Sequence, residues 1–363
     1  MKILIASGTS GGHLFPGIAV ADELKRIDKD CEVTFVTGQK AIAKKILKKE
    51  IYPYILLPNY NLPAGISFKL IPFFIGLTAT FAAAFNILRK VKPNLVLGLG
   101  GFVAGPVLLC AWLLRIPTII HEQNVFPGRT NLILSKFVEA IAISFEESAA
   151  FFKDKYKLVF TGNPIRNSLE IINKNEALVE FGFTAEKFTI FVIGGSQGAH
   201  TINQSIVKMF EKFNAEDRKG FQVIHISGES DCLEVRDRLS GLGVNSKVYS
   251  FFDKMDRAYC ASDIVISRAG GIAISEIAFF GKASILIPYP YARTHQAGNA
   301  RYMSIHNTSI VLEENELLVE RLYDKISYFY RNREKIEKFS NPPRQKGLAV
   351  QNVVDLILNL KAE

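Results

Sequence analysis

Short apolar runs alternate with helical patterns along the whole chain, in two successive series. The first series predicts strands at residues 3–6, 33–37, 54–57, 95–97, 118–121 and 140–143. The second predicts strands at residues 189–193, 222–226, 247–250, 264–266 and 284–287, with helices that begin near Asn203, Ser230, Asp253, Ile272 and His295. Continuously apolar strands are typical of a parallel sheet that helices cover on both faces. We therefore predict an α/β protein with two Rossmann-like parallel-sheet domains that face a cleft.

A turn-rich segment separates the two series. Residues 161–164 are Thr-Gly-Asn-Pro, shortly before the second series begins. A length of 363 residues suits two domains better than one, and we place these domains at residues 1–163 and 164–340. Residues 341–363 carry a last helical pattern after a pair of prolines. We expect this helix to pack back onto the first domain.

One stretch departs from the pattern, because residues 70–88 carry no charge. This stretch approaches the length of a membrane span, but Pro72 and several polar residues make it a poor one. On a helix, one apolar stripe lies opposite small residues such as Gly76 and Ala79, and its members are Phe74, Leu77, Phe81, Phe85 and Leu88. Periodicity alone favours a core helix. The alternative is a helix in a membrane interface, whose basic neighbours are attracted to anionic lipid.

Composition narrows the classes of protein. Hydrophobic residues make up 48% and charged residues 22%, as in a globular protein, and the formal net charge of +9 makes an acidic partner plausible. No basic run with interleaved aromatic residues is present, so nucleic acid is not an expected partner. The four cysteines are scattered, which predicts neither disulfides nor a zinc site. A short strand follows Met1 directly, and we expect a cytosolic, reduced protein.

Three glycine-rich turns follow predicted strands, at residues 8–13, 98–106 and 194–199. Such a turn lets a phosphate approach backbone N–H groups at the positive end of a helix, although close packing of helix on strand needs glycine equally. The first turn is not a GxGxxG fingerprint, and the second strand ends in Thr37-Gly38-Gln39-Lys40 without an acidic residue, which argues against NAD. His13 begins a helix beside this turn, where an imidazole can act as a general base.

Polar side chains gather at further strand ends and helix starts. Residues 121–124 are His-Glu-Gln-Asn, and Asn124 with Asn131 can hydrogen-bond a sugar. Residues 267–276 run from a strand into a helix whose start suits a diphosphate, and Glu276 can accept both hydroxyls of a ribose. Gln296 and Asn299 share a helix face. Each could also be an ordinary loop residue or helix-dipole partner, but as clusters they favour a binding site.

Taken in order, these motifs resemble the MurG family, membrane-associated N-acetylglucosaminyltransferases that convert lipid I to lipid II in peptidoglycan synthesis. The resemblance spans nearly the whole chain. The motifs that carry it are residues 9–13 (Thr-Ser-Gly-Gly-His), 100–106 (Gly-Gly-Phe-Val-Ala-Gly-Pro), 121–124 (His-Glu-Gln-Asn), 162–166 (Gly-Asn-Pro-Ile-Arg), 194–199 (Gly-Gly-Ser-Gln-Gly-Ala), Ser275-Glu276, and Gln296 with Asn299. Any one of them is weak, whereas the ordered set is highly specific.

The resemblance implies a GT-B architecture and an inverting transfer from UDP-GlcNAc to the 4-hydroxyl of MurNAc in lipid I. It makes His13 the base for that hydroxyl, with Glu122 as a rival. The residues implied for UDP-GlcNAc are Ser10, Gly11, Gly12, Asn124, Arg166, Ser196, Phe252, Gly271, Ile272, Ala273, Ile274, Ser275, Glu276 and Gln296. Gly100, Gly101 and Gly105 would lie at the acceptor pyrophosphate. Helix termini and Arg166 would neutralise the leaving diphosphate, so neither a metal nor another cofactor is expected.

The resemblance also favours the interfacial interpretation of residues 70–88. Phe74, Leu77, Phe81 and Phe85 would form a membrane patch, with Trp112 and Lys136 nearby. The implied partners are UDP-GlcNAc, lipid I, the anionic cytoplasmic face of the bacterial cell membrane, and other proteins of cell-wall synthesis. The protein would then be a peripheral protein of that membrane face.

The chain departs from the family pattern at three positions. Thr9 stands where glycine is usual, Ala104 replaces a usual serine, and Ala273 replaces a common threonine. None of these changes removes a proposed catalytic group. Two other classes stay open: a UDP-GlcNAc epimerase or another GT-B glycosyltransferase, which would not need the apolar stripe, and a non-catalytic lipid-binding protein, which would not need Ser275-Glu276 and Gln296.

Overall fold

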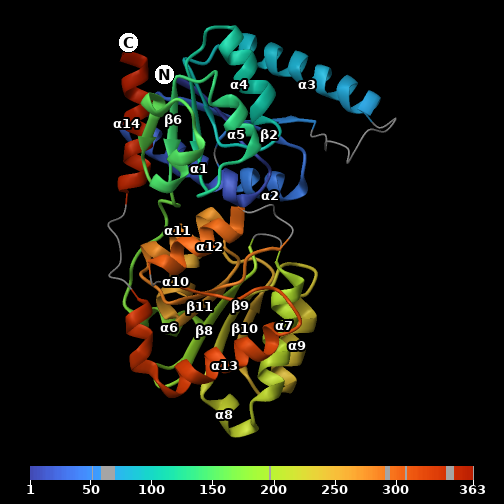
Figure 1. Cartoon of the computed structure of the whole chain (residues 1–363), viewed down its shortest axis with the longest axis vertical. Coiled ribbons are helices and arrows are strands. Elements are labelled where there is room, and N and C mark those ends of the chain that lie inside the picture. Colours follow the sequence, from blue (N-terminus) through green and yellow to red (C-terminus); the bar gives the residue numbers. More distant parts are fainter. Residues whose placement is uncertain are drawn as a thin grey trace. The chain divides into compact units, whose positions relative to one another are not determined.

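The computed structural model describes residues 1–50, 52–58, 70–195, 198–290, 295–306, 309–340 and 347–362. The chain divides into two compact units (Figure 1). Unit 1 comprises Met1–Asn167 and Gly347–Glu363, and unit 2 comprises Ser168–Lys346. Arg166, which we had assigned to the second domain, therefore lies in unit 1.

A parallel sheet forms the centre of unit 1. Among the described residues it has seven strands, in the order β3-β2-β1-β4-β5-β6-β7. Their bounds are β1 Lys2–Ala6, β2 Glu32–Gly38, β3 Tyr54–Leu57, β4 Leu95–Gly98, β5 Thr118–Glu122, β6 Ala140–Ile143 and β7 Leu158–Phe160. The six strands predicted for this half are confirmed. The short strand β7 was missed because its three residues at the sheet edge are largely exposed and carry little pattern.

Helices cover both faces of this sheet. Helices α1 (Gly11–Ile27), α2 (Ala41–Lys49) and α14 (Leu348–Ala362) contribute to one buried cluster, and α3 (Leu70–Val91), α4 (Ala104–Leu113) and α5 (Arg129–Leu134) contribute to the other. Figure 1 shows α14, in red, returning to unit 1, where Val353, Val354 and Ile357 are fully buried. Two short 3-10 helices, η1 (Glu146–Phe151) and η2 (Lys155–Lys157), precede β7.

Unit 2 repeats the parallel arrangement. Its described residues form a six-stranded sheet in the order β10-β9-β8-β11-β12-β13. The strands are β8 Phe188–Ile193, β9 Phe221–Ile226, β10 Asn245–Tyr249, β11 Ile264–Ser267, β12 Ser284–Leu286 and β13 Ser309–Val311. The helices are α6 Lys174–Phe181, α7 His200–Lys212, α8 Ala215–Lys219, α9 Cys232–Gly241, α10 Met255–Ala261, α11 Gly271–Phe279, α12 His295–Ile305, α13 Leu318–Arg331 and η3 Arg333–Phe339. The five predicted strands are confirmed, and β13, a three-residue edge strand, was missed.

The strand order places the glycine-rich turns. In unit 1, β1 lies beside β4, with Ala6 opposite Gly98, although two strands separate them along the chain. In unit 2, β8 lies beside β11 in the same way. At such a switch point the connections from neighbouring strands leave in opposite directions, which opens a crevice at the carboxyl ends of the strands. In unit 1 this order brings the turns at residues 8–13 and 98–106 together at the carboxyl ends of the strands, and in unit 2 it places the carboxyl ends of β8 and β11 side by side.

Candidate active site

The turn between β1 and α1 fixes the His13 ring. Ser10 is the residue that precedes α1, but its hydroxyl does not cap the backbone; Ser10 Oγ is hydrogen-bonded to His13 Nδ1 at 2.8 Å. Gly8 also lies against this ring, since a Cβ there would come within 2.8 Å of His13 Nδ1. A side chain at position 8 would displace the imidazole. The glycine at this position therefore serves the placement of His13.

The turn after β4 meets the first turn at van der Waals contact. Gly100 and Gly101 have φ values of +80° and +83°, which side chains rarely tolerate. A Cβ on Gly101 would lie 2.6 Å from Gly8 Cα, so the two backbones touch. A Cβ on Gly100 would lie 3.5 Å from His13 Nε2 and 3.6 Å from Asn131 Nδ2. The ring of His13 thus lies at the junction of both turns.

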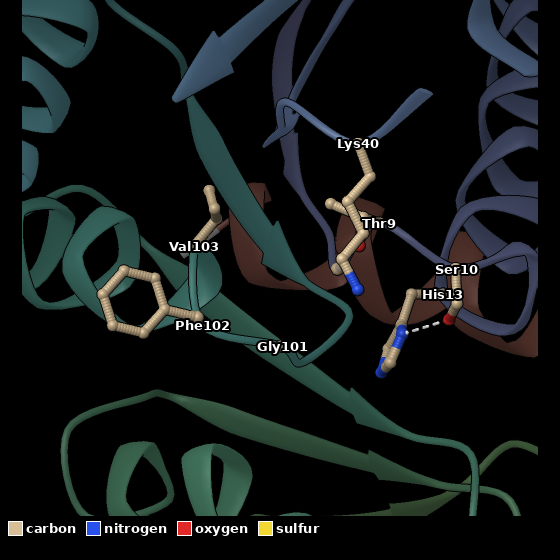
Figure 2. A pocket seen from close by; sticks show the side chains of 8 residues that line it. Thr9, Ser10, His13, Lys40, Gly101, Phe102 and Val103 are labelled. Atoms are coloured by element: carbon tan, nitrogen blue, oxygen red, sulfur yellow. Dashed lines mark hydrogen bonds between the residues drawn. The ribbon is translucent and has the colours of Figure 1, made fainter. Parts of the chain in front are cut away.

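A pocket of about 230 Å³ opens between the two turns. Figure 2 shows His13, Ser10 and Thr9 on one side of it, Gly101, Phe102 and Val103 on another, and Lys40 extending toward it. Helices α1 and α4 begin beside this pocket, after Ser10 and Val103, without a side-chain cap and without an acidic residue in the first turn. Their first backbone N–H groups have no intrahelical acceptor, and this arrangement favours an anion.

Glu122 lies at the end of β5 and is 1% exposed. Its Oε1 accepts hydrogen bonds from the backbone N–H and the side-chain amide of Asn124, both at 3.0 Å. Its Oε2 accepts from the Gly128 N–H at 2.9 Å and from Asn131 Nδ2 at 2.8 Å. Four donors therefore surround the carboxylate and tie the segment after β5 to the start of α5. These contacts suit a group that holds the loop in place better than one that accepts a substrate proton.

His121 is fully buried beside Glu122. Its Nε2 lies 3.1 Å from the Gly162 carbonyl oxygen, and its Nδ1 lies 3.2 Å from Gln123 Nε2. Burial lowers the pKa of His121 to about 4, so the ring is neutral near pH 7. Within the segment 121–124, His121 and Gln123 thus face the interior of unit 1.

Arg166 packs within unit 1, with its guanidinium 4.7 Å from the centre of the Phe15 ring. Phe15 lies on α1, two residues after His13. The cation that we expected near the donor diphosphate is therefore held next to the helix that carries His13.

In unit 2, the start of α11 follows the glycines after β11. Gly270 precedes the helix without a side-chain cap, and the first turn has no acidic residue. Ser275 Oγ donates to the Gly271 carbonyl oxygen at 2.8 Å. The side chain of Ile274 is fully buried and that of Ile272 is nearly so. Within residues 271–274, it is therefore the backbone of the first turn that suits a diphosphate.

Several expected donor residues are positioned by neighbours that sequence analysis did not single out. Tyr259 donates its hydroxyl to Glu276 Oε2 at 3.0 Å, and Glu276 is largely buried. The Tyr289 N–H donates to Gln296 Oε1 at 2.9 Å. Phe252 packs on Tyr249, with 4.7 Å between the ring centres. Ser196 lies outside the described residues.

Helix α3 exposes a different face from the one expected. The residues that face unit 1 are Phe73, Gly76, Thr80, Ala84 and Leu88. Phe74 and Ile75 are 57% and 65% exposed, whereas Leu77, Phe81 and Phe85 are half-buried, and Phe81 and Phe85 pack against the core. The expected stripe thus runs along the border of the buried face, and Gly76 lies on the buried side rather than opposite it. Residues Phe73–Val91 are long and apolar enough to cross a membrane by length and composition alone.

The structure shows where the three residues that depart from the family pattern lie. Thr9 lines the pocket. Ala104 is fully buried in the first turn of α4, and Ala273 is half-buried in the first turn of α11.

Sequence analysis missed Lys40 as a pocket residue. The signal available in the sequence was a basic residue three positions after the predicted strand at residues 33–37.

Family models match both units. Residues 3–143 match the glycosyltransferase family 28 N-terminal domain, and residues 189–357 match the glycosyltransferase family 28 C-terminal domain. These matches define the class of protein as a two-domain glycosyltransferase. Together with the relatives below, they show that the chain belongs to glycosyltransferase family 28 and, within it, to the MurG family.

The similar proteins are full-length matches. A protein of Thermoanaerobacter sp. strain X514 is 39% identical over 343 residues, which is 93% of this chain and 93% of that protein. One of Myxococcus xanthus is 35% identical over 100% of this chain and 94% of its own length. Both are named UDP-N-acetylglucosamine--N-acetylmuramyl-(pentapeptide) pyrophosphoryl-undecaprenol N-acetylglucosamine transferase.

Solved structures show the same architecture. The crystal structure of Acinetobacter baumannii MurG has a TM-score of 0.74 and 26% identity, over 99% of this chain and 100% of that one. UDP-GlcNAc 2-epimerase from Neisseria meningitidis has a TM-score of 0.70 at 16% identity, over 99% of this chain and 100% of that one. The second likeness concerns the fold alone. The predicted fold class, two parallel-sheet Rossmann-like domains as in GT-B proteins, is confirmed.

Proposed function

We propose that this protein transfers GlcNAc from UDP-GlcNAc to the 4-hydroxyl of MurNAc in lipid I, which gives lipid II. The names of the full-length relatives support the substrates and the reaction. The structural observation that carries the proposal is the His13 ring at the junction of two glycine turns, beside a pocket where two uncapped helices begin. This arrangement combines a candidate base with a site for an anionic acceptor.

His13 acts as the general base. The acceptor 4-hydroxyl oxygen attacks the anomeric carbon of GlcNAc while the bond from that carbon to the UDP oxygen breaks. His13 Nε2 takes the hydroxyl proton, and the electron pair of the broken bond leaves with UDP. Ser10 Oγ accepts a hydrogen bond from the Nδ1–H group, which orients the ring and stabilises the imidazolium that forms. Attack from the face opposite the leaving group inverts the anomeric configuration.

Glu122 is a positioning residue in this account. Its four hydrogen bonds hold Asn124 and Asn131 in place, and both Asn131 Nδ2 and the His13 ring lie close to Gly100. Asn124 contacts the donor sugar from unit 1. The base role therefore goes to His13, and Glu122 fixes the loop that completes its surroundings.

Unit 2 holds the donor. The first turn of α11, residues 271–274, binds the diphosphate through backbone N–H groups, and Ser275 supports that turn. Glu276 accepts the ribose hydroxyls, and its hydrogen bond from Tyr259 sets its orientation. Gln296 reaches the sugar, and Phe252 borders the uracil. Ser196 of unit 2 and Arg166 of unit 1 are the further residues that we propose for UDP.

The protein works at the cytoplasmic face of the bacterial membrane, because lipid I is a membrane lipid. Phe74 and Ile75 at the start of α3 supply the exposed apolar contact, and Arg89 and Lys90 lie near the other end of the same helix. Half-buried Leu77, Phe81 and Phe85 border this contact. Other cell-wall synthesis proteins are expected partners at that surface.

The experiment is a coupled UDP-release assay with UDP-GlcNAc and a soluble lipid I analogue, with mass spectrometry of the product. UDP release that requires the lipid, with a product heavier by one GlcNAc, supports the proposal. Conversion of UDP-GlcNAc without lipid would show an epimerase instead. Lipid binding with neither reaction, under conditions where the Acinetobacter baumannii enzyme turns over, would overturn the enzyme assignment in favour of a lipid-binding protein.

A further inference from the structure

Among the described residues that line the pocket at His13, Lys40 supplies the only lysine or arginine side chain. The others are Gly8, Thr9, Ser10, His13, Gly101, Phe102 and Val103, and no carboxylate is among them. Lys40 follows β2 and precedes α2, and Figure 2 shows its side chain directed toward the space that Thr9, Gly101 and His13 border. The pocket therefore carries uncompensated positive charge.

Lys40 is exposed, and its place at the pocket sets it apart from other surface lysines. Within the described part of the chain its ammonium group has no ion-pair partner, whereas Lys2 pairs with Glu32 and Lys254 pairs with Glu180. The uncapped starts of α1 and α4 add partial positive charge to the same pocket. A cation and two helix N-termini on one pocket select a ligand with more than one negative charge, such as a diphosphate.

An apolar path leads away from the pocket on one side. Phe102 lines the pocket and contacts Phe73, with 6.4 Å between ring centres. Phe73 contacts Phe74 at 5.6 Å, and Phe74 is exposed at the start of α3. A ligand that fits both features has an anionic head for the pocket and a hydrocarbon chain that leaves over Phe102. This is the chemistry of a lipid diphosphate rather than of a nucleotide.

We infer that Lys40 binds the diphosphate of the lipid acceptor and sets the affinity for that acceptor. The inference rests on the proposed function, and it adds a side-chain cation to a subsite otherwise built of backbone N–H groups. A charge-assisted hydrogen bond of this kind predicts that Lys40→Gln raises the acceptor KM about tenfold. The donor KM and kcat stay within about twofold of the wild type, because the charge does not act on the reacting atoms.

The test uses the full chain and three variants. Lys40→Gln removes the charge, Lys40→Arg keeps it, and Lys48→Gln removes a matched exposed charge about 12 Å further along α2, outside the pocket. Acceptor and donor KM values are measured for each, together with inhibition by inorganic pyrophosphate. We expect a raised acceptor KM and weakened pyrophosphate inhibition for Lys40→Gln alone, and near-normal values for Lys40→Arg.

The outcomes separate this inference from the proposed function. Wild-type turnover of the lipid acceptor is established first, and its absence would count against the function itself. If the wild type turns over and Lys40→Gln behaves like Lys48→Gln, the inference is overturned. A raised donor KM with an unchanged acceptor KM would also overturn it, because Lys40 would then contact the nucleotide.

Discussion

Ser10 Oγ lies 2.8 Å from His13 Nδ1, so the hydroxyl at the start of α1 serves the imidazole instead of the helix backbone. In the tautomer in which Nδ1 donates this hydrogen bond, Nε2 is the nitrogen that can accept a proton. A Cβ on Gly100 would lie 3.5 Å from both Nε2 and Cδ2 of this ring. The sequence resemblance had placed Ser10 at the donor sugar. From this contact we propose a second role, in which Ser10 orients the His13 ring.

This relationship predicts the kinetic effect of Ser10→Ala. Loss of the hydrogen bond frees the ring to rotate, and we expect kcat to fall about tenfold while the donor KM stays within about twofold. Ser10→Thr, which keeps the hydroxyl, should restore most of the turnover. Steady-state kinetics with varied UDP-GlcNAc measures both constants. A raised donor KM with unchanged kcat would show that Ser10 acts only on the sugar.

The four donors around Glu122 predict a stability effect. Glu122→Gln replaces one acceptor oxygen by an NH2 group, which then faces N–H donors of Asn124, Gly128 or Asn131. We expect a loss of about 1–3 kcal/mol in the free energy of unfolding, measured by urea denaturation. Exposed Glu32→Gln is the matched control and should cost far less. A stable Glu122→Gln protein with no turnover would restore Glu122 as the base.

Two buried histidines predict how stability depends on pH. Burial lowers the pKa of His121 to about 4 and that of His225 to about 3, whereas an unfolded histidine has a pKa of about 6.5. Below pH 6.5 the unfolded chain binds protons that the folded chain does not bind. The stability present above pH 6.5 is therefore lost as the pH falls toward 4, by about 1.4 kcal/mol per histidine at pH 5.5.

Urea denaturation at pH 7.5 and pH 5.5 measures this loss. The variant His121→Gln should lose less stability between the two values than the wild type, whatever its stability at pH 7.5. Exposed His306→Gln should behave like the wild type. Equal losses in all three proteins would contradict the assignment of buried, neutral histidines.

The exposure of α3 predicts which residues bind membranes. Ile75→Ser should weaken flotation with anionic vesicles severalfold and leave the unfolding midpoint unchanged, because Ile75 is 65% exposed. Phe81→Ser should lower the unfolding midpoint, because Phe81 packs against the core. If Ile75→Ser binds vesicles as well as the wild type, the membrane contact lies elsewhere on the protein.

The sequence predicted the sheets well because their strands are continuously apolar. Strands such as β1 and β8 are buried on both faces, so nearly every residue carries the apolar signal, with Lys2 and Thr189 as the exceptions. Strands β7 and β13 have only three residues each at sheet edges, and their signal is too short to recognise. The face of α3 was misplaced because Phe74 and Phe81 look equivalent on a helical wheel, although only packing against α4 decides which one is covered.

The sequence predicted which residue types form the candidate site, but it did not predict which contacts hold them. Glu122 stands at a strand end and His13 at a helix start, which the apolar pattern locates, and Glu276 lies just over one turn inside α11. The donors to Glu122 come from Gly128 and Asn131, and their approach depends on the course of the following loop. Lys40 reaches the pocket because β2 pairs beside β1, which only the sheet order shows.

The most direct test makes two measurements on His13→Ala. One is its turnover with UDP-GlcNAc and the lipid I analogue, and the other is its affinity for UDP by calorimetry. Removal of a general base predicts a fall in kcat of about 10²–10⁴-fold, with UDP affinity and the unfolding midpoint unchanged. Turnover of His13→Ala within about twofold of the wild type would contradict the central claim that His13 accepts the proton of the acceptor hydroxyl.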